Sequence, residues 1–302
     1  MQSQAEIRAS LTQKFVDALS RGVIPWRRVW RNIPDPVRLP TNFTTNRQYQ
    51  GLNIPLLWLS QQEKGYPAGF WGSFQQWRAA GASVRKGERG TTIVFWRKVT
   101  KKGRDENGDE TKDTFPLLRT WSVFNVAQVE GKVAEEFQIS LQPNGIHFEN
   151  VDRTEFDLAV AATRAEVRFG GNQPMYCRPP KDHILMPHEH QFDNFPAYAV
   201  TLAHEMLHWT EWRTGWKGSY PEGELRAEIG SCFLTSALGI PTSDDLSNHQ
   251  AYVQSWIKAL SDDPKYIFRA AAAASKGVGF VLAFSRPKTE EEAEEQEETA
   301  AA

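Results

Sequence analysis

The apolar positions near the start of the chain recur with the period of a helix. Over residues 5–22 the large apolar side chains fall on one face, namely Ile7, Leu11, Phe15, Val16 and Leu19. Four prolines between residues 22 and 50 then exclude long regular elements. Helical spacing returns in NIPLLWLSQQEK, which ends at Gly65, and a further periodic stretch over residues 70–80 ends in a turn through Gly81. We therefore expect a helix-rich opening segment.

Alternation with a period of two follows. The segments TTIVFWRKV and FPLLRTWSVFNV place apolar side chains at every second position, which predicts two strands. The polar stretch between them, KKGRDENGDETKD, is typical of an exposed hairpin loop. No clear pattern is present between residues 129 and 145, and we place a domain boundary there.

The second half is mainly helical. DRTEFDLAVAATRAEVRFG, residues 196–215, GELRAEIGSCFLTSALG, HQAYVQSWIKAL and IFRAAAAASKGVGFVLAF predict helices, and MYCRPPKDHILMP predicts one or two short strands. The last segment, EEEAEEQEET, carries like charges that cannot bury themselves. The pattern predicts an α+β fold with two domains, residues 1–135 and 146–286, followed by an acidic disordered tail over residues 287–302.

Composition excludes several classes of protein. No stretch approaches the ~20 apolar residues of a membrane span, so no membrane partner is expected. The start of the chain lacks the apolar core of a secretory signal, which favours a cytoplasmic location. Cys177 and Cys232 are the two cysteines, and their spacing predicts neither a disulfide framework nor a cysteine metal site.

The net charge of -2 conceals a strong division. Residues 1–104 hold 18 Lys and Arg against 5 Asp and Glu, whereas the remainder holds 17 basic and 32 acidic residues. Clustered cations gain affinity for nucleic acid by releasing counterions from phosphates, so the basic half predicts a polyanion partner. The alternative is a merely basic surface.

Aromatic side chains narrow that partner to single-stranded DNA. Seven of the eleven tryptophans precede residue 122, several of them beside cations, as in PWRRVWR and QQWRAA. Bases of a single strand stack on such rings while Arg and Lys meet the phosphates, and no helix-turn-helix or zinc-finger spacing is present. We expect the buried rings to be Trp58 and Trp96. The expected DNA contacts are Trp26, Arg27, Arg28, Trp30, Arg47, Trp71, Trp77, Arg78, Arg85, Lys86 and Arg89, with the four tryptophans among them facing solvent.

A metal motif lies in the second half. AHEMLHW contains H-E-x-x-H as His204, Glu205 and His208. Residues four apart on a helix share a face, so both imidazoles can bind one ion while the glutamate acts as general base. We expect Zn2+, or another divalent metal such as Mn2+, with Glu205 as the catalytic base.

The motif alone arises by chance, for example as two surface histidines on a helix. The helix is otherwise apolar, which makes unpaired histidines costly, and DHILMP resembles the edge strand that holds an extended peptide in such sites. Glu224 and Glu228 follow one turn apart, and either can complete the site. Similarity to glutamate-type zinc peptidases implies that Glu224 is the ligand and Glu228 orients a histidine, with the reverse assignment left open. His183, His188 and His190 form another cluster, whose more ordinary interpretation is a surface loop.

The motifs together resemble ArdC-like antirestriction proteins. NRQYQGLNIPLLWL, GFWGSFQQWRAAGASVRKGERGTTIVFW and FNVAQVEG are similar to the single-stranded DNA-binding domain of that family, and DHILMP, AHEMLHWT and ELRAEIG to its zincin-like metallopeptidase domain. The resemblance implies a protein that protects incoming plasmid DNA from host restriction.

Three functions remain open from the sequence. The N-terminal half can act by binding single-stranded DNA, or by contacting a host restriction enzyme, with a non-catalytic or accessory metal site. Alternatively, DNA recruits the peptidase to a DNA-bound protein, whose cleavage is the useful event. A metal-dependent nuclease fits less well, because H-E-x-x-H with a glutamate base suits amide hydrolysis.

Overall fold

The structure, a computed structural model, describes residues 3–27, 39–104, 110–135, 151–241 and 250–286. In the first half its elements are α1 Gln4–Ser20, β1 Thr41–Asn42, α2 Asn53–Lys64, β2 Phe70–Ser73, α3 Phe74–Ala79, β3 Ser83–Val84, β4 Thr91–Arg104, β5 Glu110–Asn125 and β6 Val129–Glu130. In the second half they are α5 Thr154–Thr163, β7 Val167–Phe169, β8 Met175–Cys177, β9 His183–Met186, α6 Phe195–Arg213, α7 Tyr220–Ala237, α8 Gln250–Asp262 and α9 Tyr266–Leu282. The predicted α+β class is confirmed.

Local sequence explains where the first helices begin and end. Ser3 and Glu6 form a reciprocal capping box at the start of α1: the Glu6 amide donates to the Ser3 hydroxyl at 3.2 Å, and the Ser3 amide donates to the Glu6 carboxylate at 2.7 Å. The helix α2 ends at Gly65, whose φ of 64° lies in the left-handed region that favours glycine.

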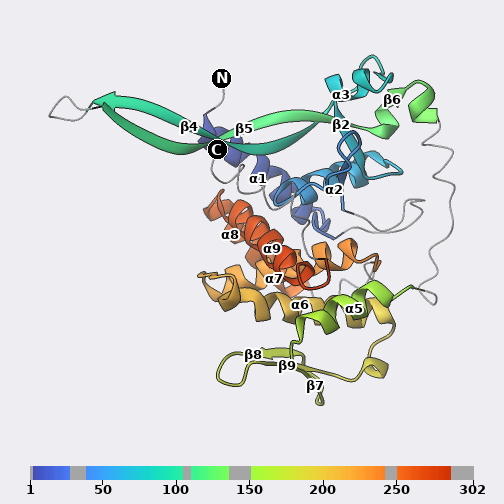
Figure 1. Cartoon of the computed structure of the whole chain (residues 1–302), viewed down its shortest axis with the longest axis vertical. Coiled ribbons are helices and arrows are strands. Elements are labelled where there is room, and N and C mark those ends of the chain that lie inside the picture. The colour runs from blue at the N-terminus through green and yellow to red at the C-terminus, as the bar shows by residue number, and fades with distance from the viewer. Residues whose placement is uncertain (1–2, 28–38, 105–109, 136–150, 242–249, 287–302) are drawn as a thin grey trace.

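A long hairpin of β4 and β5 dominates the first half and projects beyond the helices (Figure 1). It belongs to a four-stranded sheet of order β1-β2-β5-β4. Both strands continue into the stretch predicted to be a loop, because Lys101 pairs with Asp113 and Arg104 with Glu110. The predicted loop was therefore too long.

The two halves share one hydrophobic core. The helices α1 and α2 lie between the hairpin and the C-terminal helices (Figure 1), and α1 contacts both β5 and α8. Trp58 of α2 packs edge-on against Phe233 of α7, with ring centroids 5.7 Å apart. The Thr12 hydroxyl of α1 donates to the Pro264 carbonyl at 2.8 Å. Residues from both halves therefore form one continuous apolar cluster.

A small sheet of order β7-β9-β8 lies at the end of the molecule opposite the hairpin (Figure 1). The helix predicted over residues 152–170 ends early, because Arg164 adopts a left-handed φ of 54° after α5 and the chain then enters β7. DHILMP forms β9, which pairs with strands on both sides. The prediction that it is an edge strand is therefore wrong; among the described strands β7 and β8 are the edges of this sheet, and β8 contacts α6.

Glycines allow α6, α7 and α9 to approach one another closely. A Cβ atom at Gly230 of α7 would lie 2.6 Å from Leu207 of α6. A Cβ atom at Gly277 of α9 would lie 2.7 Å from Leu207 and from the Arg226 guanidinium. This contact brings the acidic side chains of α7 to the histidines of α6.

The predicted tail over residues 287–302 and the centre of the predicted boundary lie outside the described residues. Within the described part of the chain, no helix has both the length and the apolar character needed to cross a bilayer.

Candidate metal centre and nucleic-acid interface

The motif helix α6 holds its two histidines side by side. Asn194 caps the helix, since its side-chain oxygen accepts the Ala197 amide at 2.9 Å. One turn separates His204 from His208, and their Nε2 atoms lie 3.2 Å apart. Two nitrogen ligands at ~2.05 Å from a tetrahedral zinc lie roughly 3.3 Å apart. The pair therefore has the spacing of two ligands of one ion.

Glu224 of α7 completes a set of three donors. Its carboxylate oxygens lie 3.7 Å from Nε2 of His204 and 3.5 Å from Nε2 of His208. Among the described residues, these three side chains are the group whose donor atoms fall within 4.8 Å of one another. Two imidazoles and one carboxylate fit a divalent metal, and zinc above all.

Glu228 lies on the other side of the His204 ring. Its Oε2 atom is 4.0 Å from Nδ1 of His204, the nitrogen that faces away from the other donors. This is the place of a carboxylate that orients a ligand histidine. The geometry supports Glu224 as the metal ligand and Glu228 as the carboxylate that orients His204.

His208 has a carboxylate partner of its own. Its Nδ1–H donates to Glu211 at 2.8 Å, and Glu211 accepts in turn from Arg178 at 2.8 Å. The sequence analysis did not identify Glu211, although its position three residues after His208 places it on the same helix face. Each histidine therefore presents Nε2 to the ion while a carboxylate faces Nδ1.

Glu205 has the environment of a general base. Its side chain is buried beside a cavity of about 280 Å³, which His204, Glu224 and Pro174 also line. Burial raises the pKa of Glu205, an effect that the two histidines and a hydrogen bond from the Tyr176 backbone amide partly offset. Tyr176 lies in β8, so this edge strand lies against the carboxylate of Glu205.

The charges of the centre stabilise one another. Burial lowers the pKa of His204, but the hydrogen bond with Glu224 and the nearby glutamates outweigh it and leave that pKa raised. Burial raises the pKa of Glu224, and the hydrogen bond and charges of the histidines more than reverse this effect. The imidazole of His204 and the carboxylate of Glu224 therefore each favour the charged form of the other.

The second histidine cluster does not converge. His183 is buried in β9, whereas His188 and His190 are exposed and stack with ring centroids 5.6 Å apart. Within the described residues they form no metal-binding group. The surface-loop interpretation therefore fits His188 and His190, whereas the buried His183 of β9 does not fit it.

The family profiles that match the chain divide it in two. Residues 5–124 match the N-terminal domain of anti-restriction factor ArdC, and residues 154–273 match a zincin-like metallopeptidase. A Sinorhizobium fredii protein described as uncharacterized protein y4eC is 31% identical, with 91% of each chain covered. The crystal structure of the metal-free antirestriction protein ArdC from plasmid R388 is 31% identical, with a TM-score of 0.76, 94% of this chain covered and 99% of that one.

The chain belongs to the ArdC antirestriction family. The Mn(II)-bound crystal structure of ArdC from plasmid R388 is 30% identical to this chain, with a TM-score of 0.71, 93% of this chain covered and 99% of that one. A divalent metal site in the zincin-like part therefore agrees with the predicted cofactor. The chain is also 34% identical to the DNA primase TraC of Escherichia coli over 95% of its own length, but it spans only 28% of TraC.

The ArdC-type N-terminal part buries rings that we predicted to face solvent. Trp26, Trp71 and Trp77 are all 0% exposed, so that prediction is wrong, and a fully buried ring cannot stack on a base. Trp77 stacks on Phe43 with ring centroids 4.5 Å apart, and its indole N–H donates to the Phe124 carbonyl at 3.0 Å. A large apolar surface with one satisfied polar atom favours the core even beside arginines.

The two tryptophans assigned to the core differ. Trp58 is 2% exposed, which confirms the prediction, whereas Trp96 is 50% exposed and the prediction is wrong. Trp96 lies on β4 with the Arg8 guanidinium 5.5 Å from its ring centroid. Trp30 and Arg28 lie outside the described residues.

The predicted DNA-binding cations divide in the same way. A DNA contact requires an exposed side chain. The predicted cations that are exposed are Arg47, Arg78, Arg85, Lys86 and Arg89. Arg85 is also held within the fold by Glu88 at 2.9 Å. Arg27 is an exception, because it is buried and lines the same cavity as His204 and Glu205. Its predicted role as a DNA contact does not fit that position.

Several exposed aromatic side chains lie on the hairpin, and they were not among the predicted DNA contacts. Phe95, Phe115 and Trp121 are 40%, 41% and 53% exposed. Strand alternation was the signal available, because Val94 and Leu118 face the core and their neighbours along each strand must face outward.

Proposed function

We propose that this ArdC-family protein binds single-stranded DNA through its N-terminal half and carries a metal-dependent peptidase centre in its C-terminal half. The observation that carries the peptidase assignment is the convergence of His204, His208 and Glu224 beside the buried carboxylate of Glu205. We propose that the protein protects incoming plasmid DNA in the cytoplasm by occupying the strand.

The residues of the centre have separate roles in hydrolysis. His204, His208 and Glu224 would hold the divalent ion. When bound, that ion supplies Lewis acidity, which polarises a peptide carbonyl and lowers the pKa of water to about 7. Glu205 accepts the proton from the attacking water and returns it to the leaving amine.

The β8 edge provides a place for the substrate backbone. The strand pairs only with β9 among the described strands, so its other edge can add an extended peptide. The Tyr176 amide, directed at Glu205, brings this edge to the base. An extended peptide on β8 would therefore lie across the catalytic carboxylate.

The outer hairpin face supports single-strand binding. Phe95 pairs with Arg119 and Ile93 with Trp121, and paired residues project to one side of the sheet. The Phe95 and Trp121 rings lie edge to face with centroids 6.4 Å apart, and Arg97 lies two residues beyond Phe95 on the same face. Exposed rings interleaved with cations form a stacking platform for a single strand.

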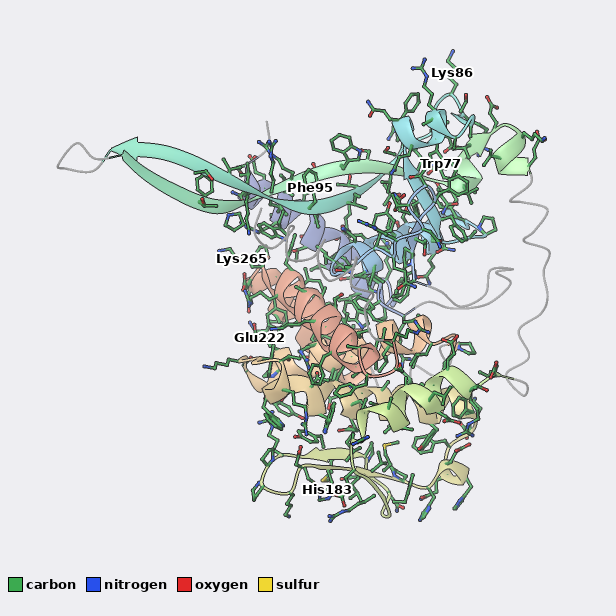
Figure 2. The ribbon with its side chains drawn as sticks, viewed as in Figure 1. Trp77, Lys86, Phe95, His183, Glu222 and Lys265 are labelled. Carbon is green, nitrogen blue, oxygen red and sulfur yellow. The ribbon has the colours of Figure 1, made fainter. Side chains whose placement is uncertain are left out.

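The distribution of charge and aromatic residues separates the two activities in space. Figure 2 shows Phe95 and Lys86 on the N-terminal half, at the opposite end of the molecule from His183 of the small sheet. The second half is acidic and would repel phosphates. The strand would therefore be held away from the peptidase centre, leaving β8 open to a protein substrate such as a restriction enzyme or another DNA-bound protein.

Glu205→Gln tests the peptidase assignment, because an amide cannot accept the proton. We expect Zn(II)- or Mn(II)-loaded wild-type protein to cleave fluorescein-labelled casein, and Glu205→Gln to keep its metal but lose at least about 100-fold in rate. Glu63→Gln, an exposed glutamate paired with Arg21, is the matched control and should retain the rate. Equal cleavage by wild type and Glu205→Gln would remove Glu205 from the mechanism.

A further inference from the structure

An arginine from the first half of the chain reaches the metal centre. The Arg27 Nε atom lies 3.3 Å from Oε1 of Glu228, and each side chain is only 6% exposed. The other carboxylate oxygen of Glu228 faces Nδ1 of His204 at 4.0 Å. Arg27, Glu228 and His204 therefore form a continuous row of polar groups that ends at a residue of the proposed metal centre.

The backbone before Arg27 is anchored on the peptidase helices. The Trp26 ring is 0% exposed and packs edge-on against Trp256 of α8, with centroids 5.4 Å apart. The Arg27 amide donates to the Ile24 carbonyl at 3.0 Å and closes a turn after α1. The position of Arg27 is therefore fixed by the packing of Trp26 and by this turn as well as by the ion pair.

The other histidine has an analogous partner with a different origin. His208, Glu211 and Arg178 form the corresponding row, but Arg178 comes from the segment after β8, and its side chain is 68% exposed. Both carboxylates are buried, but water can reach the place of the exposed Arg178 guanidinium, whereas Arg27 is itself only 6% exposed. The two rows therefore provide a matched comparison within one centre.

We propose that Arg27 is a positioning residue of the metal centre, contributed by the ArdC-type N-terminal half, that holds Glu228 against His204 and so raises metal affinity. The proposal rests on the metal centre proposed above. Both halves of the chain would then form the centre. The zincin-like half holds the ligands, and the N-terminal half, acting through Glu228, fixes one of them, His204.

The physical reason is the cost of a buried carboxylate. A buried charge that loses its partner is strongly destabilised and shifts toward another position or solvent. Glu228 would then cease to fix the His204 ring. Partners that orient ligand histidines typically contribute 10–100-fold to metal affinity, so a measurable part of the affinity depends on Arg27.

The test measures Zn(II) affinity of the full chain by competition with a chromophoric chelator. We expect Arg27→Met to lose roughly tenfold in affinity and Arg27→Lys, which keeps the charge, to recover part of that loss. Arg178→Met should lose less than about threefold, since its side chain is 68% exposed. Arg21→Met, on an exposed pair with Glu63, is the matched control and should bind as wild type.

If Arg27 acts through Glu228, the effects of substitutions at these two positions on Zn(II) affinity should not be additive. In a Glu228→Gln background, Arg27→Met should cause no further loss of affinity, because the group it positions is already neutral. Equal and additive losses in both backgrounds would contradict the proposal, as would unchanged affinity in folded Arg27→Met.

The double variant keeps the proposal testable if Arg27→Met does not fold. Arg27→Met with Glu228→Gln removes both buried charges and leaves none without a partner. If this folded variant binds Zn(II) as tightly as wild type, the proposal is wrong. Wild-type protein that binds no metal would instead contradict the proposed peptidase centre, so the two failures are distinguishable.

Discussion

The proposed metal centre and the outer face of the hairpin differ in the kind of surface that each would offer to its ligand, a metal ion or single-stranded DNA. The centre gathers His204, His208 and Glu224 within 4.8 Å of one another beside the 7% exposed Glu205. The hairpin instead spreads Phe95 and Trp121 over an outer face, at 40% and 53% exposure. The side chains of the metal centre are largely buried and contact neighbouring carboxylates, whereas the hairpin face is exposed to solvent and carries several similar aromatic rings.

This difference predicts how each region responds to substitution. An ion needs every donor at a defined distance, so the loss of one ligand should lower metal affinity by a large factor. A single strand contacts many equivalent rings and cations, so the loss of one should reduce affinity by a limited amount. The predictions below test this contrast in order of expected effect.

The largest effect should follow removal of both histidines. We expect His204→Ala with His208→Ala to lose the bound ion completely, because two of three donors are gone. Elemental analysis of purified protein would measure this loss, and DNA binding should persist. Metal content equal to that of wild type would place the site elsewhere in the chain.

The two acidic residues of α7 should differ in the next largest effect. Glu224→Ala removes a donor and should lower Zn(II) affinity by more than about 100-fold, whereas Glu228→Ala removes an orienting partner and should cost 10–100-fold. Chelator competition would compare them. A larger loss at Glu228 would reverse their roles.

Two glycines of α9 test the helix packing that supports the centre. A Cβ atom at Gly277 would lie 2.7 Å from Leu207 and from Arg226, and 2.9 Å from the Thr210 hydroxyl, whereas nothing lies within 4 Å at Gly279. We expect Gly277→Ala to lower the free energy of unfolding by about 1–3 kcal/mol. Gly279→Ala should raise it by up to about 1 kcal/mol.

Denaturant unfolding followed by circular dichroism would measure both glycine variants. Equal effects at the two positions would show that the close approach of α9 to α6 and α7 is not what the stability depends on.

A single hairpin ring should have a limited effect on DNA binding. We expect Trp121→Ala to weaken binding of an oligothymidine by about 1–3 kcal/mol, the typical contribution of one stacked base. Fluorescence anisotropy would measure the change, and Zn(II) affinity should stay the same. Phe169→Ala, a 52% exposed ring on β7, is the control for a ring outside the platform. If the two variants weaken binding equally, the hairpin platform is incorrect.

The common helix face of the two histidines could be predicted from sequence because helix geometry is local. A spacing of four residues places His204 and His208 on one face whatever surrounds them. Glu224 lies on another helix, and its distance from them depends on the close contact at Gly230, which no local pattern shows. For this reason the distances of Glu224 and Glu228 from the histidines could not be predicted from sequence.

The tryptophans could not be assigned to surface or core from their neighbours. Trp77 precedes Arg78, yet the ring is 0% exposed while Arg78 is exposed, because adjacent residues of a helix point in different directions. Trp96 and Phe95 face opposite sides of β4, and both are exposed because the hairpin extends beyond the helices that cover its base (Figure 1). The length of that extension is a tertiary property.

Arg27 shows the same limit most clearly. In the sequence it stands beside Trp26 in a basic, aromatic segment and resembles a DNA contact. In the structure it pairs with Glu228, two hundred residues later in the chain, because Trp26 packs on α8. Long-range packing, rather than local composition, decides its role.

The central claim is that the hairpin platform binds the incoming strand and so protects it. The most direct measurement compares plasmid transfer into restricting and non-restricting recipients that produce wild-type protein or a variant with both Phe95→Ala and Trp121→Ala. We predict that the double variant folds, binds metal as wild type does, and fails to protect the plasmid in the restricting recipient alone. Full protection by a double variant that has lost its affinity for single-stranded DNA would contradict the account.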